Sequence, residues 1–184
     1  GSDARMNGCE QPVVINSGSG NQGITSSVPV IVYARAMEVG EEKMLRALTL
    51  SNLTTIHEKT PIGRLSAYCG AVSAGAGAGA GIAYLCGGDY DVIAHTVVNA
   101  LAIVSGIVCD GAKASCAAKI ASAVDAAILG HFLGRKHHWF QPGEGIIQKD
   151  VEGTIKSMGY IGRVGMKDTD KQILNIMIDQ VKVD

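Results

Sequence analysis

The amino-acid sequence predicts a mostly α-helical, compact multi-helix domain with buried glycine- and alanine-rich helices. Hydrophobic residues make up 47% of the 184 residues and charged residues only 18%, which is a globular composition with a small charged surface. Aromatic residues contribute only 4%, so the core must be built from small aliphatic side chains, with glycine at close contacts. Apolar residues recur at helical spacing along most of the chain, and extended segments are few.

The first part of the chain combines an extended run with a polar loop. Residues 12–16 (PVVIN) have the apolar, β-branched character of a short strand, and a loop of Gly, Ser, Asn and Gln is expected over residues 17–23. A helix is expected over residues 24–38, with Pro29 either kinking it or lying in its first turn. Further helices are expected over residues 41–57, 66–85, 91–105, 113–133, 151–158 and 168–181.

Glycine and alanine alternate within residues 71–85 (AVSAGAGAGAGIAYL). In an isolated helix each glycine costs about 1 kcal/mol relative to alanine, and silk-like β-structure is the alternative. Because the run has only a few repeats, we favour a buried helix whose glycines let neighbouring helices approach closely. Residues 91–105 are apolar on nearly all sides and are expected to form a central helix. The uncharged stretch over residues 67–88 gains little from lipid, so no membrane helix is expected.

The chain has five cysteines, at positions 9, 69, 86, 109 and 116. An odd number without a signal peptide argues against a disulfide scaffold and predicts a cytoplasmic protein. In that compartment the thiols are expected to be buried, catalytic or bound to metal. Cys86 is expected in the core. Cys9 lies beside the polar loop and is not expected to bind a metal.

Two of the cysteines, Cys109 and Cys116, occur close together in the segment CDGAKASC. On one continuous helix they would lie about 10.5 Å apart along the axis, too far for adjacent ligands of one small cluster. The dipeptide Asp110-Gly111 is a strong turn signal, so Cys109 can lie in a loop and Cys116 in the first turn of the next helix. The N-terminus of that helix and Lys113 would favour a thiolate there.

Cys69 lies near the start of the Gly-Ala helix, and an antiparallel return of the chain would bring it to Cys109 and Cys116. From spacing alone, ordinary buried thiols explain the three cysteines about as well as a metal site does. Zinc is a weaker alternative, because there is no CxxC pair and no His at finger spacing. Three thiolates without a fourth ligand suit an iron–sulfur cluster with one open iron, which could act as a Lewis acid.

The polar loop NSGSGNQG contains the pattern GxGxxG at Gly18, Gly20 and Gly23. A dinucleotide-binding unit is disfavoured because no second strand and no suitably placed acidic residue follow. Backbone N–H groups and short polar side chains at the start of a helix can equally hold a carboxylate, and an ordinary tight turn is the third possibility. The candidate substrate-binding residues are Asn16, Ser17, Gly18, Ser19, Gly20 and Asn21.

The remaining polar residues give little indication of function, and no catalytic base can be identified. His57 and His95 are single residues on apolar helices and are expected in the core. The other three histidines lie near Trp139, in or beside a polar loop that is expected to be solvated. Lys119 and Asp125 are expected at the surface or in ion pairs.

Three segments together resemble the serine dehydratase alpha-chain superfamily, and most closely its L-cysteine desulfidase-like branch. These segments are NSGSGNQG, SAYCGAVSAGAGAGAGIAYL and CDGAKASC, and the resemblance extends from about Ala4 to Met177. It implies a largely helical catalytic domain with a [4Fe-4S] cluster. Three cysteines hold that cluster and leave one iron for substrate; the matching positions are Cys69, Cys109 and Cys116.

The resemblance also implies a lyase that works without pyridoxal phosphate. Such enzymes remove water from L-serine, or sulfide from L-cysteine, to give pyruvate and ammonia. Family chains are longer, and their N-terminal half supplies further substrate-binding and base residues. Residues 1–184 are therefore expected to be the cluster-bearing catalytic portion of a longer chain, which could also form a homodimer.

Two other classes of function remain open at this point. One is a non-catalytic helical domain that packs against a partner subunit, and the less favoured one is a dinucleotide-binding domain. The net charge of -1 and the lack of a basic stripe predict no nucleic-acid partner.

Overall fold

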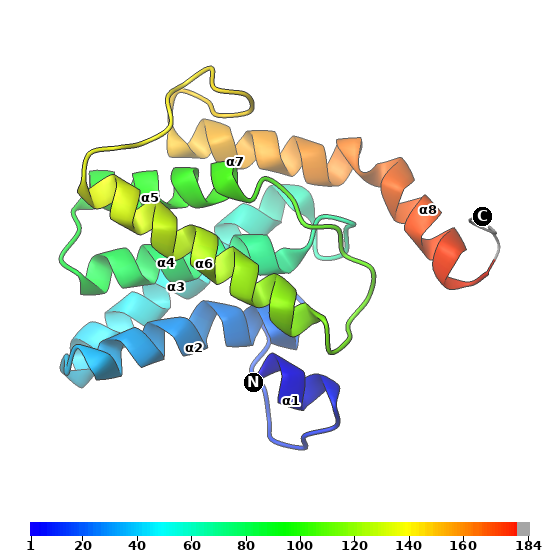
Figure 1. Cartoon of the computed structure of the whole chain (residues 1–184), viewed down its shortest axis with the longest axis horizontal. Coiled ribbons are helices and arrows are strands. Elements are labelled where there is room, and N and C mark those ends of the chain that lie inside the picture. The colour runs from blue at the N-terminus through cyan, green and yellow to red at the C-terminus, as the bar shows by residue number, and fades with distance from the viewer. Residues whose placement is uncertain (180–184) are drawn as a thin grey trace.

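The computed structural model describes residues 1–179, which form helices and, within that range, no strand (Figure 1). The predicted mostly α-helical class is therefore confirmed. The helices are α1 (Ser2–Met6), α2 (Gly20–Ala36), α3 (Glu41–Ile62), α4 (Gly70–Leu85), α5 (Tyr90–Ile103), α6 (Cys116–Arg135), α7 (Val151–Tyr160), the π-helix η1 (Ile161–Gly165) and α8 (Lys167–Met177).

The Gly-Ala helix α4 is the centre of the bundle, where α2, α3, α5 and α6 all pack against it (Figure 1). Almost every residue of α4 is buried, so the silk-like alternative is wrong and the prediction of a buried helix is confirmed. The prediction of a central helix over residues 91–105 is confirmed only in part: α5 packs against α4, α6 and α7, but not along its whole length. Its start is exposed, with Tyr90 at 74% exposure, and its core residues are confined to the stretch from Thr96 to Leu101.

Two opposite faces of α4 carry only glycine at their points of closest contact. Residues two apart on a helix point about 200° from each other, so alternating glycines fall on two sides. A Cβ atom added at Gly75 would lie 2.8 Å from the backbone of Ala123 in α6. One added at Gly77 would lie 2.3 Å from the Thr55 hydroxyl and 2.6 Å from the Ser51 carbonyl in α3. Glycine is thus required at these positions because the neighbouring helices lie too close for a side chain, and not because of its backbone conformation.

Several helix boundaries differ from the predictions. Residues 12–16 do not form a strand, and α2 begins at Gly20, within the predicted loop, so Pro29 lies in the interior of that helix. Helix α3 continues past its predicted end at residue 57 and includes Pro61. Pro61 packs against Gly159 of α7, where an added Cβ would lie only 2.4 Å from the proline ring. A proline disfavours the helical conformation of the residue before it, and the packing of Pro61 against α7 offsets this cost.

His57 was expected in the core, but its side chain is exposed. Its Nε2 lies 2.8 Å from Oε2 of Glu152, so the histidine joins α3 to α7 at the surface. Lys119 was expected either at the surface or in an ion pair, and in the structure it forms an ion pair with Asp110.

The last described helix, α8, projects from the end of the bundle and has no buried residue (Figure 1). It begins at Lys167, next to the predicted start at residue 168, and residues 180 and 181 of the prediction lie outside the described range. Among the described helices, α6 is the one long and apolar enough to cross a membrane by length and composition. In this fold one side of α6 packs against α4 and α5, and the rest of the helix is partly or fully exposed.

Candidate functional site

A pocket of about 280 Å³ lies where α2, α4 and α6 begin, and we call it the cysteine pocket. All three predicted metal ligands line it, namely Cys69, Cys109 and Cys116. Its other walls come from the polar loop, from α3 and from the two loops that precede α4 and α6. The structure therefore brings together the two sequence features that were singled out separately, the cysteines and the polar loop.

Cys69 and Cys109 are brought together by backbone pairing. The Cys69 N–H donates to the carbonyl of Ile107 at 2.9 Å, and the Cys109 N–H donates to the carbonyl of Ala67 at 2.7 Å. These bonds flank an antiparallel bridge between Tyr68 and Val108. The predicted antiparallel return is therefore made by the segments 67–69 and 107–109, which carry one cysteine each.

The two sulfur atoms form one coupled acid–base pair. A hydrogen bond from the Cys69 thiol holds the pKa of Cys109 at about 6, and the Gly111 N–H and the Lys119 ammonium act in the same direction. The same hydrogen bond and burial raise the pKa of Cys69. Cys109 is thus the thiolate of the pair, and thiolates are the form that binds metal.

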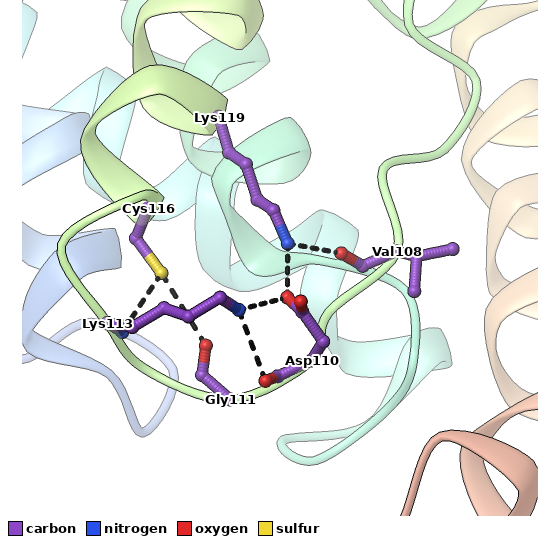
Figure 2. A network of polar contacts seen from close by, with 6 residues as sticks. All are labelled: Val108, Asp110, Gly111, Lys113, Cys116 and Lys119. Carbon is purple, nitrogen blue, oxygen red and sulfur yellow. Dashed lines mark hydrogen bonds and ion pairs between the residues drawn. The ribbon is translucent and has the colours of Figure 1, made fainter. Parts of the chain in front are cut away.

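Cys116 is the first residue of α6, as the turn signal predicted, and Gly111 in the preceding loop has a φ of 93°. Figure 2 shows that the Lys113 N–H donates to the Cys116 sulfur at 3.4 Å and that the thiol lies 3.6 Å from the Gly111 carbonyl. Lys113 thus contacts Cys116 through its backbone N–H, while its ammonium bonds Asp110.

The loop between Cys109 and Cys116 is held by Asp110 and two lysines (Figure 2). The Asp110 carboxylate accepts from the ammonium groups of Lys113 and Lys119, and these bonds lower its pKa to about 2. Lys119 also donates to the Val108 carbonyl at 2.8 Å. One lysine of α6 therefore contacts the residues on both sides of Cys109.

The polar loop begins with a tight turn. Asn16 and Ser19 exchange two backbone hydrogen bonds of 3.0 and 3.2 Å, and Ser17 and Gly18 between them have φ values of 49° and 89°. The Asn16 amide donates to the Asn52 side chain at 2.9 Å, so it fixes the loop to α3. Asn16 is buried and does not line the cysteine pocket.

Of the other candidate substrate-binding residues, some line the cysteine pocket and some do not. Gly18, Ser19 and Asn21 line the cysteine pocket, and Ser17 lines a neighbouring cleft of about 520 Å³. Gly20 lies against the Arg5 guanidinium, which donates to the Asn21 amide oxygen at 3.0 Å.

The third glycine of the GxGxxG pattern has a packing role. An added Cβ at Gly23 would lie 1.8 Å from the Val14 carbonyl oxygen. No strand leads into this loop within residues 1–179, so the structural context of a dinucleotide-binding fingerprint is missing.

Three further residues of the pocket were not recognised from the sequence: Gln22, Lys59 and Arg64. Gln22 is buried, packs on Gly70 at the start of α4, and its Oε1 atom has no hydrogen-bond partner among the described residues. Lys59 is only 4% exposed. No sequence signal identifies either, because a polar residue of a helix acquires its surroundings only from tertiary packing.

The residues present fit an iron–sulfur cluster by the chemistry of the donor set. Three thiols line one pocket, the neighbouring Cys69 thiol lowers the pKa of Cys109, and the helix N-termini around them favour thiolates. Within residues 1–179, no group of three or more His, Cys, Asp or Glu side chains lies close enough to hold a single metal ion. A cluster with several irons spreads its protein ligands more widely than a single ion does.

Comparison with protein families gives one match over nearly the whole chain. The family model described as "Serine dehydratase alpha chain" matches residues 1–175. This range includes the polar loop, the Gly-Ala helix and all three cysteines of the pocket.

Curated relatives of this chain are named UPF0597 proteins. One from Desulfitobacterium hafniense is 66% identical over 180 residues, which cover 98% of this chain and 42% of the relative. One from Lachnoclostridium phytofermentans is 59% identical over 97% of this chain and 43% of the relative. One from Fusobacterium nucleatum is 48% identical over 96% of this chain and 42% of the relative. The chain spans about two fifths of the length of these relatives, and no solved structure matches it.

Proposed function

Because this chain belongs to the serine dehydratase alpha-chain family, we propose that it is the cluster-binding portion of a lyase that acts on a small amino acid. In this proposal Cys69, Cys109 and Cys116 hold a [4Fe-4S] cluster. The enzyme eliminates water from L-serine or sulfide from L-cysteine without pyridoxal phosphate. The enamine that results hydrolyses to pyruvate and ammonia.

The observation that carries the proposal is the cysteine pocket itself. Three thiols from three separate segments line a cavity that the polar loop also lines. When bound, an iron–sulfur cluster with an open iron would supply a Lewis acid that draws a hydroxide or thiolate leaving group off the substrate. Ordinary buried thiols would not need a cavity between them, and they would not need a polar loop opposite.

The chain's own residues have distinct tasks in this proposal. The backbone bridge between segments 67–69 and 107–109 sets the separation of two ligands, and the Asp110 network holds the loop that leads to the third. Ser19 and Asn21, at the start of α2, face the pocket and can donate hydrogen bonds to the amino acid. The general base remains unassigned.

The pocket's size limits the substrate class. The volume of about 280 Å³ is at the lower end for small-molecule sites, and in this proposal the cluster and the substrate share it, so it suits no substrate larger than a small amino acid. Nothing in the lining separates a hydroxyl from a thiol leaving group. We therefore propose L-serine and L-cysteine as equal candidates.

Anaerobic reconstitution with iron and sulfide tests the first part of the proposal. The full natural protein should become brown and hold about four irons per chain. A protein that stays colourless with all three cysteines reduced would refute the cluster.

Turnover tests the second part. Pyruvate should form from L-serine, L-cysteine or both, and sulfide should be released with L-cysteine. A brown protein that yields pyruvate from neither amino acid would leave the cluster in place and refute the proposed reaction.

A further inference from the structure

Lys59 is a buried cation that lines the cysteine pocket from α3. It is 4% exposed, and within residues 1–179 it takes part in none of the ion pairs. The adjacent carboxylate, Glu58, is buried too, and no lysine or arginine of the described residues pairs with it. A buried ammonium without a carboxylate partner is costly, so an anion that enters the pocket would gain strongly from contact with it.

Two cysteines of the pocket influence the charge of Lys59. Burial lowers the pKa of Lys59, while the neighbouring Cys109 and Cys69 oppose that change. In the proposed function these two sulfurs are ligands whose charge is shared with iron. The two sulfurs therefore do not neutralise the Lys59 ammonium, which stays available to bind an anion.

The helix ends around the pocket have the same preference for an anion. Helices α2, α4 and α6 all begin at the pocket, and none of them has a side-chain hydrogen bond at its N-cap. Absence of a side-chain cap is not special to these three helices, since α1, α3 and α8 lack one too. At α6 the first N–H groups already bond the carbonyls of residues 113–115, so the helix starts contribute to the cavity mainly the partial positive charge of their dipoles.

This inference rests on the proposed function and deepens it. A neutral-pH amino acid has one anionic group, its α-carboxylate, and Lys59 is the buried cation in the pocket that can receive it. Arg64 lies at the exposed rim, where its stem packs on Gly18. We propose that Lys59 binds the α-carboxylate of the substrate and so orients the amino acid in the cysteine pocket.

The test compares Lys59→Met with the charge-conserving Lys59→Arg in the full natural protein, reconstituted anaerobically. Lys43→Met is the control, because Lys43 is an exposed residue of the same helix. Calorimetric titration measures the affinity for L-serine and for 2-aminoethanol, which lacks the carboxylate. Iron content and the absorption spectrum are recorded for each variant.

We expect Lys59→Met to keep its iron and to bind L-serine roughly 10- to 100-fold more weakly, as loss of a charge-assisted hydrogen bond predicts. Its affinity for 2-aminoethanol should not change, Lys59→Arg should recover part of the loss, and Lys43→Met should behave as the wild type. Loss of iron in Lys59→Met, or equal weakening for both ligands, would overturn the proposal.

If Lys59→Met fails to fold, the wild-type protein still tests the proposal through its affinities for the two ligands. The wild-type protein must bind L-serine at least about 10-fold more tightly than 2-aminoethanol, and equal affinity would refute the role of Lys59. The two proposals can also fail separately. Lys59-dependent binding of L-serine without pyruvate would refute the lyase reaction alone, whereas turnover unaffected in Lys59→Met would refute the carboxylate site alone.

Discussion

Cys69 and Cys109 contact each other in the cysteine pocket, although 39 residues separate them in the sequence. The contact follows from the backbone bridge between their segments and does not depend on the side chains themselves. Replacement of either cysteine should therefore remove a ligand without disturbing the bridge.

Cys109→Ser should abolish cluster binding while the helical fold is kept. Serine has nearly the shape of cysteine but is a poor ligand for iron in place of a thiolate. Iron content after anaerobic reconstitution measures the loss, and circular dichroism checks the fold. Cys86→Ser is the matched control, since Cys86 ends α4 and does not line the pocket. Full iron content in Cys109→Ser would contradict the ligand assignment.

Lys119→Met should loosen the loop that carries Cys109. The substitution removes the bonds to the Val108 carbonyl and to Asp110, which should lower the free energy of unfolding by about 1–2 kcal/mol. The reconstituted variant should also lose iron faster to a chelator than the wild type does. Lys43→Met, an exposed lysine on α3, should do neither. Identical chelator kinetics in all three proteins would show that the network in Figure 2 is dispensable.

Gly77→Ala should destabilise the bundle by about 1–3 kcal/mol, because the new methyl group would overlap the Thr55 hydroxyl and the Ser51 carbonyl. Urea unfolding measures the change. Gly165→Ala in η1 is the control, since nothing lies within 4 Å of an added Cβ there. A neutral Gly77→Ala would mean that α3 can move away from α4 without cost.

Glu58 should make the stability of the protein depend on pH. Burial raises its pKa well above the usual range, and the nearby Ser73 hydroxyl opposes this change only in part. The folded state therefore binds the proton more tightly than the unfolded state. This contribution to stability is complete below the pKa of unfolded Glu, about 4.3, and is lost as the pH rises towards the folded value.

The substitution Glu58→Gln removes this titration. Between pH 5 and pH 8 the variant should gain stability relative to the wild type. The gain should grow by about 1.4 kcal/mol for each pH unit over which the folded wild type keeps its proton and the unfolded chain does not. Thermal unfolding at the two pH values measures the difference, and Glu10→Gln, at an exposed position, should show none. An equal gain at pH 5 and pH 8 would contradict the raised pKa of Glu58.

The fold class and the positions of Cys109 and Cys116 on either side of a turn could be predicted from the sequence because both depend on local signals. Apolar spacing indicated the helices, and the Asp110-Gly111 turn correctly placed Cys116 at the start of α6. The pairing of segments 67–69 and 107–109 had no such signal, since backbone hydrogen bonds form irrespective of side chain. Lys59 was missed for a related reason: it looks like any surface lysine of a helix, and only its burial at the cysteine pocket makes it unusual.

The start of α2 was misplaced because Gly, Asn and Gln occupy its first turn. Glycine and asparagine are poor helix formers, so the sequence suggested a loop until Ile24. In the structure Gln22 and Asn21 are buried against α4 and α1, and this packing compensates for the low helix propensity of Asn21 and the glycines.

The glycines on both faces of α4 have a mechanical consequence for the pocket. Helix α4 starts directly after Cys69, and its bare faces press it against α3, which carries Lys59, and against α6, which begins with Cys116. Because no side chains lie between these helices to absorb a change, a displacement of one helix should displace the other two. The walls of the cavity should therefore move together, so that a substitution in the distant core changes the positions of all three sulfur atoms.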